Sequence, residues 1–407
     1  MRRLFFFTPT SRWLVLWLIS ALLPSARCDA ADKKPLKVFI LVGQSNMQGH
    51  ASIKTFDHMG MDPKTAPLLG EMQHQDGTPR VCQSVWISSL STNGIKEGAL
   101  TTGFGADGNK IGPELTFGIT VQKMLGGPIL LIKAAWGGKS LHTDFRPPSA
   151  GPYVFSEAQI ENLEKRGEDM EAIKVDKQKV SGECYRLTLA HVKKVLANIP
   201  EVCPDYEPEQ GYDVCGLVWF QGWNDMVDRG TYPDRASPGG YDEYSRLMGH
   251  FIRDMRKDLE LPGLPVVIGV MGVGGPVENY GPDQQRYQST HQNFRKAMAA
   301  PARLPEFKGN VSADLTEKYW DMELDGLVAR NERVKQELRR AQKENKLSSR
   351  EAQELGGKLR NKEFSQREAE ILGKGISNAA YHYLGSAKIM AGIGKGFAEA
   401  VIDLQAQ

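Results

Sequence analysis

Four short apolar runs that alternate with predicted helices most constrain the fold of this chain. Each run is rich in Val, Ile and Leu and is as long as a single strand; they occupy residues 36–42, 128–134, 214–220 and 265–271. Continuous apolar character over such a length is typical of strands buried on both faces of a sheet. Helices are predicted at residues 112–125, 183–196, 241–259 and 284–299. Strands that alternate with helices form βαβ units, so we predict an α/β fold with a doubly wound parallel sheet.

The remaining segments extend this pattern. Short strands are predicted near Val85 and Val311, and residues 50–110 and 142–178 are otherwise expected to be long loops. The final helix, residues 384–404, carries apolar residues at helical spacing, so one face of it is expected to pack on the sheet.

Residues 1–31 have the layout of a secretory signal peptide. Three arginines precede an apolar stretch, residues 13–23, and small residues follow it. The stretch is shorter than the ~20 residues that span a bilayer. We therefore predict cleavage near Ala30 or Ala31 and export to the periplasm or the extracellular space, with no membrane span in the mature chain, residues 32–407; an uncleaved signal anchor is the alternative.

Four cysteines remain after removal of this leader: Cys82, Cys184, Cys203 and Cys215. An exported protein can oxidise them, and four cysteines allow three pairings. Cys203 and Cys215 flank a loop rich in Pro, Asp, Glu and Gly, which favours that pair. Buried free thiols are the alternative.

The charge and the motifs of the chain exclude several classes of function. The formal net charge is only +2, so nothing draws the protein electrostatically to nucleic acid, and no nucleic-acid partner is expected. The sequence contains no P-loop, dinucleotide fingerprint, Cys-x-x-Cys or His-Glu-x-x-His motif. No metal or cofactor is therefore expected.

A charged segment, residues 327–374, interrupts the βαβ pattern before the last helix. It is dense in Glu, Lys, Arg, Gln and Asn, and Ser348-Ser349-Arg350-Glu351 within it is typical of a helix start. We predict a charged helical hairpin inserted into the domain. Such a segment is usually a solvated helix face; an arm that docks a partner or forms an oligomer is the alternative.

Polar residues follow three of the predicted strands at the point where each strand ends. Gly43-Gln44-Ser45-Asn46-Met47 follows the first run, Gly137 and Gly138 follow the second, and Asn224 follows the third. The carboxyl ends of strands in an open α/β sheet face the ligand crevice. A serine there is placed to act as a nucleophile, two glycines to expose backbone N–H groups, and an asparagine to donate from its amide. The alternatives are a capping serine, a tight turn and a capping asparagine.

These blocks resemble the SGNH (GDSL-like) hydrolases, and more narrowly the sialate O-acetylesterase and carbohydrate acetylesterase branch. Gly43–Met47 resembles the first block of that superfamily, and Gly222-Trp223-Asn224-Asp225 matches its Gly-x-Asn-Asp block. Gly112-Pro113-Glu114, Trp136-Gly137-Gly138 and Tyr381-His382-Tyr383 follow in family order. The resemblance implies a flavodoxin-like sheet and a cofactor-free esterase that removes O-acetyl groups from sugars.

The resemblance also implies roles for individual residues. Ser45 would be the nucleophile and His382, near the C-terminus, the base. The oxyanion donors would be Gly137, Gly138 and Asn224. Substrate contacts are expected from Gln44, Gln221, Trp136 and Trp223.

The sequence departs from the family pattern at the acid partner of His382. SGNH enzymes usually carry Asp three residues before the His, but that position is Ala379, and its neighbour Asn378 is uncharged. We select Asp321, which precedes the charged segment, as the acid. A Ser-His dyad oriented by a backbone carbonyl is the alternative, and Asp321 would then be a helix cap.

The predicted function is that of a secreted serine esterase that removes O-acetyl groups from carbohydrate through an acyl-enzyme. Its predicted partner is an acetylated carbohydrate substrate. A lipid or aryl ester hydrolase of the same fold is one alternative. A catalytically degenerate carbohydrate-binding or scaffold protein, which contacts partners through the charged segment, is the other.

Overall fold

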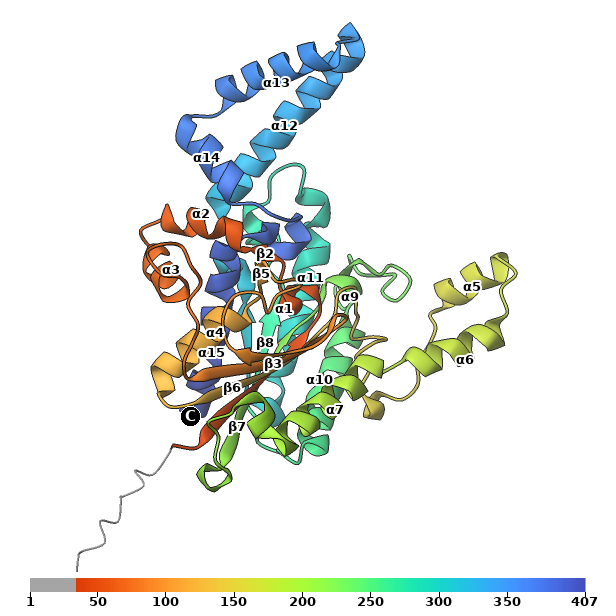
Figure 1. Cartoon of the computed structure of the whole chain (residues 1–407). Coiled ribbons are helices and arrows are strands. Elements are labelled where there is room, and N and C mark those ends of the chain that lie inside the picture. The colour runs from red at the N-terminus through yellow and green to blue at the C-terminus, as the bar shows by residue number, and fades with distance from the viewer. Residues whose placement is uncertain (1–33, 407) are drawn as a thin grey trace, which may run out of the picture. The chain divides into compact units, whose positions relative to one another are not determined.

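A seven-stranded sheet organises residues 34–406, the part of the chain that the computed structural model describes (Figure 1). The strand order is β4-β3-β6-β1-β7-β8-β9, and every neighbouring pair is parallel except β3 with β4. The strands are β1 (Leu36–Gly43), β3 (Val85–Ser91), β4 (Gly94–Ala99), β6 (Ile129–Ala135), β7 (Tyr212–Phe220), β8 (Val266–Val270) and β9 (Val311–Leu315). This mostly parallel sheet confirms the predicted α/β fold. The predicted leader, residues 1–31, lies outside the described residues.

The central strand β1 marks the point where the chain reverses its direction across the sheet. Val42 of β1 pairs with Ala134 of β6 on one side and with Trp219 of β7 on the other. The loops that follow β6 and β7 therefore leave the sheet on either side of the end of β1. Ligand crevices of open α/β sheets form at such a switch point, at the carboxyl ends of the strands.

Helices cover both faces of the sheet, and two consecutive residues of β7 show how. Trp219 packs on Phe251 of α10 (Asp242–Asp258), with ring centroids 4.5 Å apart. Phe220 points the other way and packs on Phe397 of α15 (Ala387–Gln405) at 5.2 Å. Side chains alternate between faces along a strand, so each layer receives half of the apolar residues.

The other large helices join these two layers. The face of α15 also carries α4 (Glu114–Leu125), and the face of α10 carries α7 (Glu183–Ala197) and α11 (Gln288–Ala299) (Figure 1). These helices lie within a few residues of the ranges predicted from the sequence.

Several elements lie where long loops were expected. Residues 142–178 include α5 (Glu157–Lys165) and α6 (Met170–Val180), which project from the sheet layers (Figure 1). Neither helix contains a fully buried residue, so the apolar periodicity that reveals a helix in sequence is weak in both. Residues 50–110 likewise contain short elements: β2 (Ala51–Ser52), α2 (Phe56–Gly60), α3 (Ala66–Met72), β4 and β5 (Lys110–Ile111).

The charged segment lies within three consecutive helices. They are α12 (Met322–Asn345), α13 (Ser349–Glu363) and α14 (Gln366–Lys374). Ser348 caps α13, and Glu351 returns a hydrogen bond to it, as expected from the sequence. Arg330 of α12 pairs with Glu363 and Glu368, which joins the three helices.

The predicted disulfide between Cys203 and Cys215 is not formed. All four cysteines of the described chain are free thiols. Cys203 is buried, whereas Cys215 lies within β7 and donates from Sγ to the carbonyl of Asp213. Burial raises the pKa of the Cys203 thiol to about 12, so it is protonated at neutral pH. Among the described helices, none combines the length and apolar character needed to cross a membrane.

Candidate active site

Ser45 begins the short helix α1 (Ser45–Gln48) directly after the end of β1. A Cβ atom at Gly43 would collide with the carbonyl oxygen of Phe220, so glycine lets the end of β1 lie against β7. At the other end of α1, Gly49 adopts a φ of +96°, which favours glycine, and packs on Gly112. The helix is therefore held between the sheet and the block that starts at Gly112.

A buried lysine supports the C-terminal end of α1. Lys133 of β6 donates from Nζ to the carbonyl oxygen of Gln48 (2.8 Å) and to Oε2 of Glu114 (2.7 Å). The other carboxylate oxygen of Glu114 accepts from the N–H of Gly112 (2.8 Å). The Gly112-Pro113-Glu114 block thus contributes to the position of Ser45 through Lys133.

The side chain of Gln44 fixes the orientation of Asn224. A backbone N–H can only donate, so the oxygen of Gln44 is the atom that lies 3.0 Å from the N–H of Gly222. The amide nitrogen of Gln44 then donates to Oδ1 of Asn224 (3.0 Å). This leaves the NH₂ group of Asn224 free to donate elsewhere, as an oxyanion donor must.

Asp225 joins the loops after β6 and β7. Its carboxylate accepts from the N–H groups of Leu141 (2.8 Å) and His142 (3.1 Å) and from Nε2 of Gln221 (2.6 Å). Burial raises the pKa of Asp225 to about 6, although these hydrogen bonds favour its charged form. Asp225 is therefore a structural group that sets the distance between the two loops.

Three of the four residues expected to contact substrate are buried. Gln44 and Gln221 hydrogen-bond to each other (3.2 Å) and to the groups described above, so they orient the site instead of facing a ligand. Trp136 packs on Phe145, with ring centroids 5.9 Å apart. Trp223 is half-buried and faces Tyr381 at 5.6 Å, which leaves it as the residue of this set placed to touch a substrate.

Gly137 and Gly138 lie beside the end of β1. The N–H of Trp136 donates to the carbonyl of Gly43 (3.3 Å), which positions the start of their loop. Both glycines are exposed, and Gly138 has a φ of +73°. Within residues 34–406 no carbonyl or side chain accepts from either N–H group. Both groups are therefore available as oxyanion donors.

The turn that carries His382 docks on α1. It belongs to the 3-10 segment Ala380–Gly385, and Nδ2 of Asn46 donates to the carbonyl of Tyr381 (3.1 Å). The ring of His50 stacks on that of His382, with centroids 4.0 Å apart and planes inclined by 2°. Asn46 and His50 lie one and five residues after Ser45. Their contacts therefore bring His382 to the end of β1 that carries Ser45.

Asn378 fixes the tautomer of His382. The N–H of Ala379 donates to Oδ1 of Asn378 (2.8 Å), which identifies that atom as the oxygen. The same oxygen lies 3.1 Å from Nδ1 of His382, so Nδ1 carries the proton. The lone pair of the ring is therefore on Nε2, as a general base requires.

Burial keeps His382 neutral. It lowers the pKa of His382 to about 4, and the charge of Lys110 acts in the same direction. The pKa of His50 is also lowered to about 4, first by burial and then by His382. Both rings are thus neutral, and His382 is able to accept a proton, over the whole physiological range.

The backbone that follows His382 is strained. Tyr383 and Leu384 have φ values of 53° and 59°, a region that residues other than glycine rarely adopt. The buried hydroxyl of Tyr383 holds this turn, because it contacts Oγ1 of Thr316 (2.6 Å) and accepts from the N–H of Gly272 (2.9 Å). Such strain persists where the surroundings impose it, which is common at functional sites.

The structure does not bring Asp321 to His382. Asp321 caps α12 by accepting from the N–H of Leu324 (3.0 Å). Its carboxylate pairs with Lys388 (2.9 Å) and lies 3.7 Å from His58. The group at Nδ1 of His382 is Asn378, so the assignment of Asp321 as the acid partner finds no support in this geometry.

Sequence reasoning missed two contributors to the site, His50 and Tyr383, and discounted Asn378 because it is uncharged. His50 and Tyr383 act through contacts with residues remote in sequence, which no periodic pattern marks. The contact of Asn378 is a local one, with His382 four residues further along the chain. Within the described residues, no three His, Cys, Asp or Glu side chains gather as they would around a metal ion.

Residues 35–319 match a family model described as carbohydrate esterase, sialic acid-specific acetylesterase. The match ends before Asp321 and His382. Among solved structures, a protein from Arabidopsis thaliana is 16% identical with a TM-score of 0.37, over 69% of this chain and 85% of that one. A carbohydrate acetylesterase from Xanthomonas citri is 13% identical with a TM-score of 0.37, over 68% of this chain and 49% of that one. No curated protein matches the chain significantly.

Proposed function

The chain belongs to the carbohydrate esterase family described as sialic acid-specific acetylesterases, and from this premise we propose that it removes O-acetyl groups from sugars through an acyl-enzyme on Ser45. The observation that carries the proposal is the docking of the His382 turn on the helix that Ser45 begins. A nucleophile and a histidine with a free Nε2 lone pair are the two groups that acyl transfer requires.

In the proposed reaction, Oγ of Ser45 attacks the acetyl carbonyl carbon while Nε2 of His382 accepts its proton. The tetrahedral intermediate collapses when His382 returns that proton to the sugar oxygen, which leaves an acetyl group on Ser45. His382 then takes a proton from a water molecule as that water attacks the acetyl group. When the second tetrahedral intermediate collapses, His382 passes this proton to Oγ of Ser45 and acetic acid departs, which ionises to acetate.

The negative oxygen of each intermediate needs donors that are already in place. The NH₂ group of Asn224, oriented by Gln44, is one. The N–H groups of Ser45 and of Gly137 or Gly138 are the others. Fixed donors of this kind are worth on the order of 10²–10³ in rate each.

The uncharged partner of His382 limits the proposed rate. Asn378 orients the ring as an aspartate would, but it does not stabilise the imidazolium that forms during the reaction. We therefore propose an esterase slower than one with an Asp at this position. The same feature favours the second candidate, a carbohydrate-binding protein with a degenerate site.

The test is acetate release by the protein without residues 1–31, wild type beside Ser45→Ala. The substrates are acetylated polysaccharides, O-acetylated sialic acid and 4-nitrophenyl acetate. Release from the sugars that Ser45→Ala abolishes supports the proposal, and the ranking of substrates names the sugar. If folded wild type releases no acetate, the esterase proposal is rejected and the carbohydrate-binding protein becomes the favoured function. Export and an oligomerising role for residues 327–374 stay predictions.

A further inference from the structure

A pocket of about 460 Å³ lies beside the Ser45 centre, over the carboxyl ends of β7, β8 and β9. Trp223 follows β7, Val273 and Gly274 follow β8, and Trp320 follows β9; all four line the pocket. Ala380, at the start of the His382 turn, lines it too. Ser45 and His382 are not among the lining residues, so the pocket adjoins the acetyl-transfer centre without being part of it.

The lining combines flat apolar faces with hydrogen-bonding groups. Four aromatic rings contribute to it: Trp223, Tyr280, Tyr287 and Trp320. The polar groups include the half-buried carboxylate of Asp325, the ring of His291 and the exposed guanidinium of Arg229. A sugar ring offers C–H faces to aromatic rings and hydroxyls to donors and acceptors, so this lining fits a sugar. An acyl chain would desolvate Asp325 and Arg229 without replacing their hydrogen bonds.

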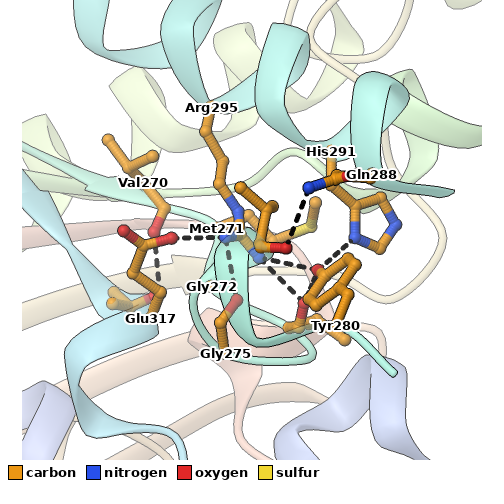
Figure 2. Close-up of polar contacts among 12 residues, drawn as sticks. Val270, Met271, Gly272, Gly275, Tyr280, Gln288, His291, Arg295 and Glu317 are labelled. Carbon is orange, nitrogen blue, oxygen red and sulfur yellow. Dashed lines mark hydrogen bonds and ion pairs between the residues drawn. The ribbon is translucent and has the colours of Figure 1, made fainter. Parts of the chain in front are cut away.

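Buried contacts occupy one ring nitrogen of His291 and leave the other for a ligand. Nδ1 of His291 lies 2.6 Å from the hydroxyl of Tyr280, as Figure 2 shows. Arg295 donates to that hydroxyl (3.2 Å) and also to the carbonyl of Val273 (2.9 Å). The hydroxyl of Tyr280 itself donates to the same carbonyl (3.1 Å). The pairing of Nδ1 with Tyr280 leaves Nε2 of His291 as the ring nitrogen that a ligand hydroxyl can reach.

Arg295 fixes the side of the pocket that is formed by Val273, Tyr280 and His291. Its guanidinium is buried, donates to the carbonyl of Gly275 (2.9 Å) and pairs with Glu317 (Figure 2). It thereby joins the loop after β8 to the segment after β9. This side of the pocket is formed before any ligand arrives, which lowers the entropy cost of binding.

We propose that this pocket binds a pyranose ring of the acetylated substrate, with Asp325 and Nε2 of His291 on its hydroxyls and Trp223 or Trp320 against its face. The proposal rests on the proposed function, because it assigns the sugar part of the substrate to this pocket and the acetyl group to Ser45. It implies that the protein gains affinity from the glycan that a small aryl acetate cannot supply.

The first test compares two substrates in pocket variants. Asp325→Asn and His291→Leu are measured on acetylated xylo-oligosaccharides and on 4-nitrophenyl acetate. We expect kcat/KM on the oligosaccharides to fall about tenfold in each, as for loss of one or two hydrogen bonds, and to stay within twofold on the aryl ester. Asp403→Asn, the same chemical change on the exposed end of α15, is the matched control.

Equal losses on both substrates, or none on either, would overturn the proposal. His291→Leu removes both ring nitrogens from a buried cluster, so its result counts only if its melting temperature matches that of wild type. Asp325→Asn, at a half-buried position, carries the test if that variant does not fold.

A binding experiment separates this proposal from the proposed function. Ser45→Ala is titrated with the same oligosaccharides, and tryptophan fluorescence reports occupancy near Trp223 and Trp320. Saturable binding that Asp325→Asn weakens about tenfold supports the pocket, even if wild type hydrolyses nothing. In a second outcome, wild type hydrolyses the oligosaccharides, but neither Asp325→Asn nor His291→Leu changes their binding when added to Ser45→Ala. That result would support the esterase activity and reject the pocket as the sugar site.

Discussion

The ring of His50 lies parallel on the ring of His382, with centroids 4.0 Å apart and planes inclined by 2°. His50 is five residues beyond Ser45, so the same short segment carries the proposed nucleophile and covers one face of the proposed base. Nδ1 of His50 is buried and has no hydrogen-bond partner in the described chain. The stack therefore excludes water from His382 without offering it a charge.

The pH profile should reflect this burial. The proposed base, His382, can accept a proton only when it is neutral, and burial lowers its pKa from 6.5 to about 4. At pH 5 an ordinary histidine would be only ~3% neutral, whereas His382 stays ~90% neutral. We expect kcat/KM on 4-nitrophenyl acetate to hold from pH 7 to about pH 5 and to fall as pH drops through about 4.

Replacing His50 should shift the pH at which kcat/KM falls on the acidic side, the acidic limb of the profile. His50→Ala opens the face of His382 to water, which reduces the desolvation and raises the pKa of His382 toward 6.5. His50→Phe keeps an aromatic face and should leave the limb near its wild-type position. The measurement is kcat/KM between pH 3.5 and pH 8, and an identical limb in His50→Ala would contradict a positioning role.

Asn378→Asp should raise activity. The carboxylate keeps the acceptor for Nδ1 of His382 and adds a negative charge that stabilises the imidazolium. We expect kcat to rise about tenfold and the acidic limb to move toward neutral pH, because the charge raises the pKa of His382. Asn378→Ala, which removes the acceptor, should lower kcat on the same ester. A lower kcat in Asn378→Asp would show that the charge is not what the site lacks.

Gln44→Glu should disable Asn224 without removing it. Both carboxylate oxygens accept, so Asn224 would turn its NH₂ group toward the new carboxylate and its oxygen toward the reacting carbonyl. We expect kcat to fall by about 10²–10³ with little change in KM. Asn224→Ala should give a similar loss, and the double variant should be no worse than either. Additive losses would show that Gln44 acts by another route.

Asp321→Asn tests whether Asp321 takes part in catalysis. The structure uses Asp321 as the cap of α12 and as the partner of Lys388, so kcat should stay within about twofold of wild type. Asp321→Ala also removes the cap and should lower the free energy of unfolding by about 1 kcal/mol or more. Activity and chemical denaturation are measured on both. A large loss of kcat in folded Asp321→Asn would restore Asp321 as the acid partner.

Much of the scaffold followed from local patterns. The four apolar runs became β1, β6, β7 and β8, because strands buried on both faces must be apolar throughout. Parallel strands bring their carboxyl ends to one edge of the sheet, so the positions of Ser45, Gly137 and Asn224 along the chain were enough to predict that they lie together. Helices α5 and α6 were missed because neither contains a fully buried residue, and burial is what produces hydrophobic periodicity in a sequence.

Several partners of the site residues were decided by tertiary structure. Sequence order favoured Asp321 as the acid, but the fold uses it on Lys388 and presents Asn378 to His382. Gln44 was expected to touch substrate, and burial instead makes it the group that orients Asn224. The physical reason is one of range. Short stretches of sequence determine burial and backbone preference. A hydrogen bond between side chains 180 residues apart, such as that from Gln44 to Asn224, depends instead on how the whole sheet brings its strand ends together.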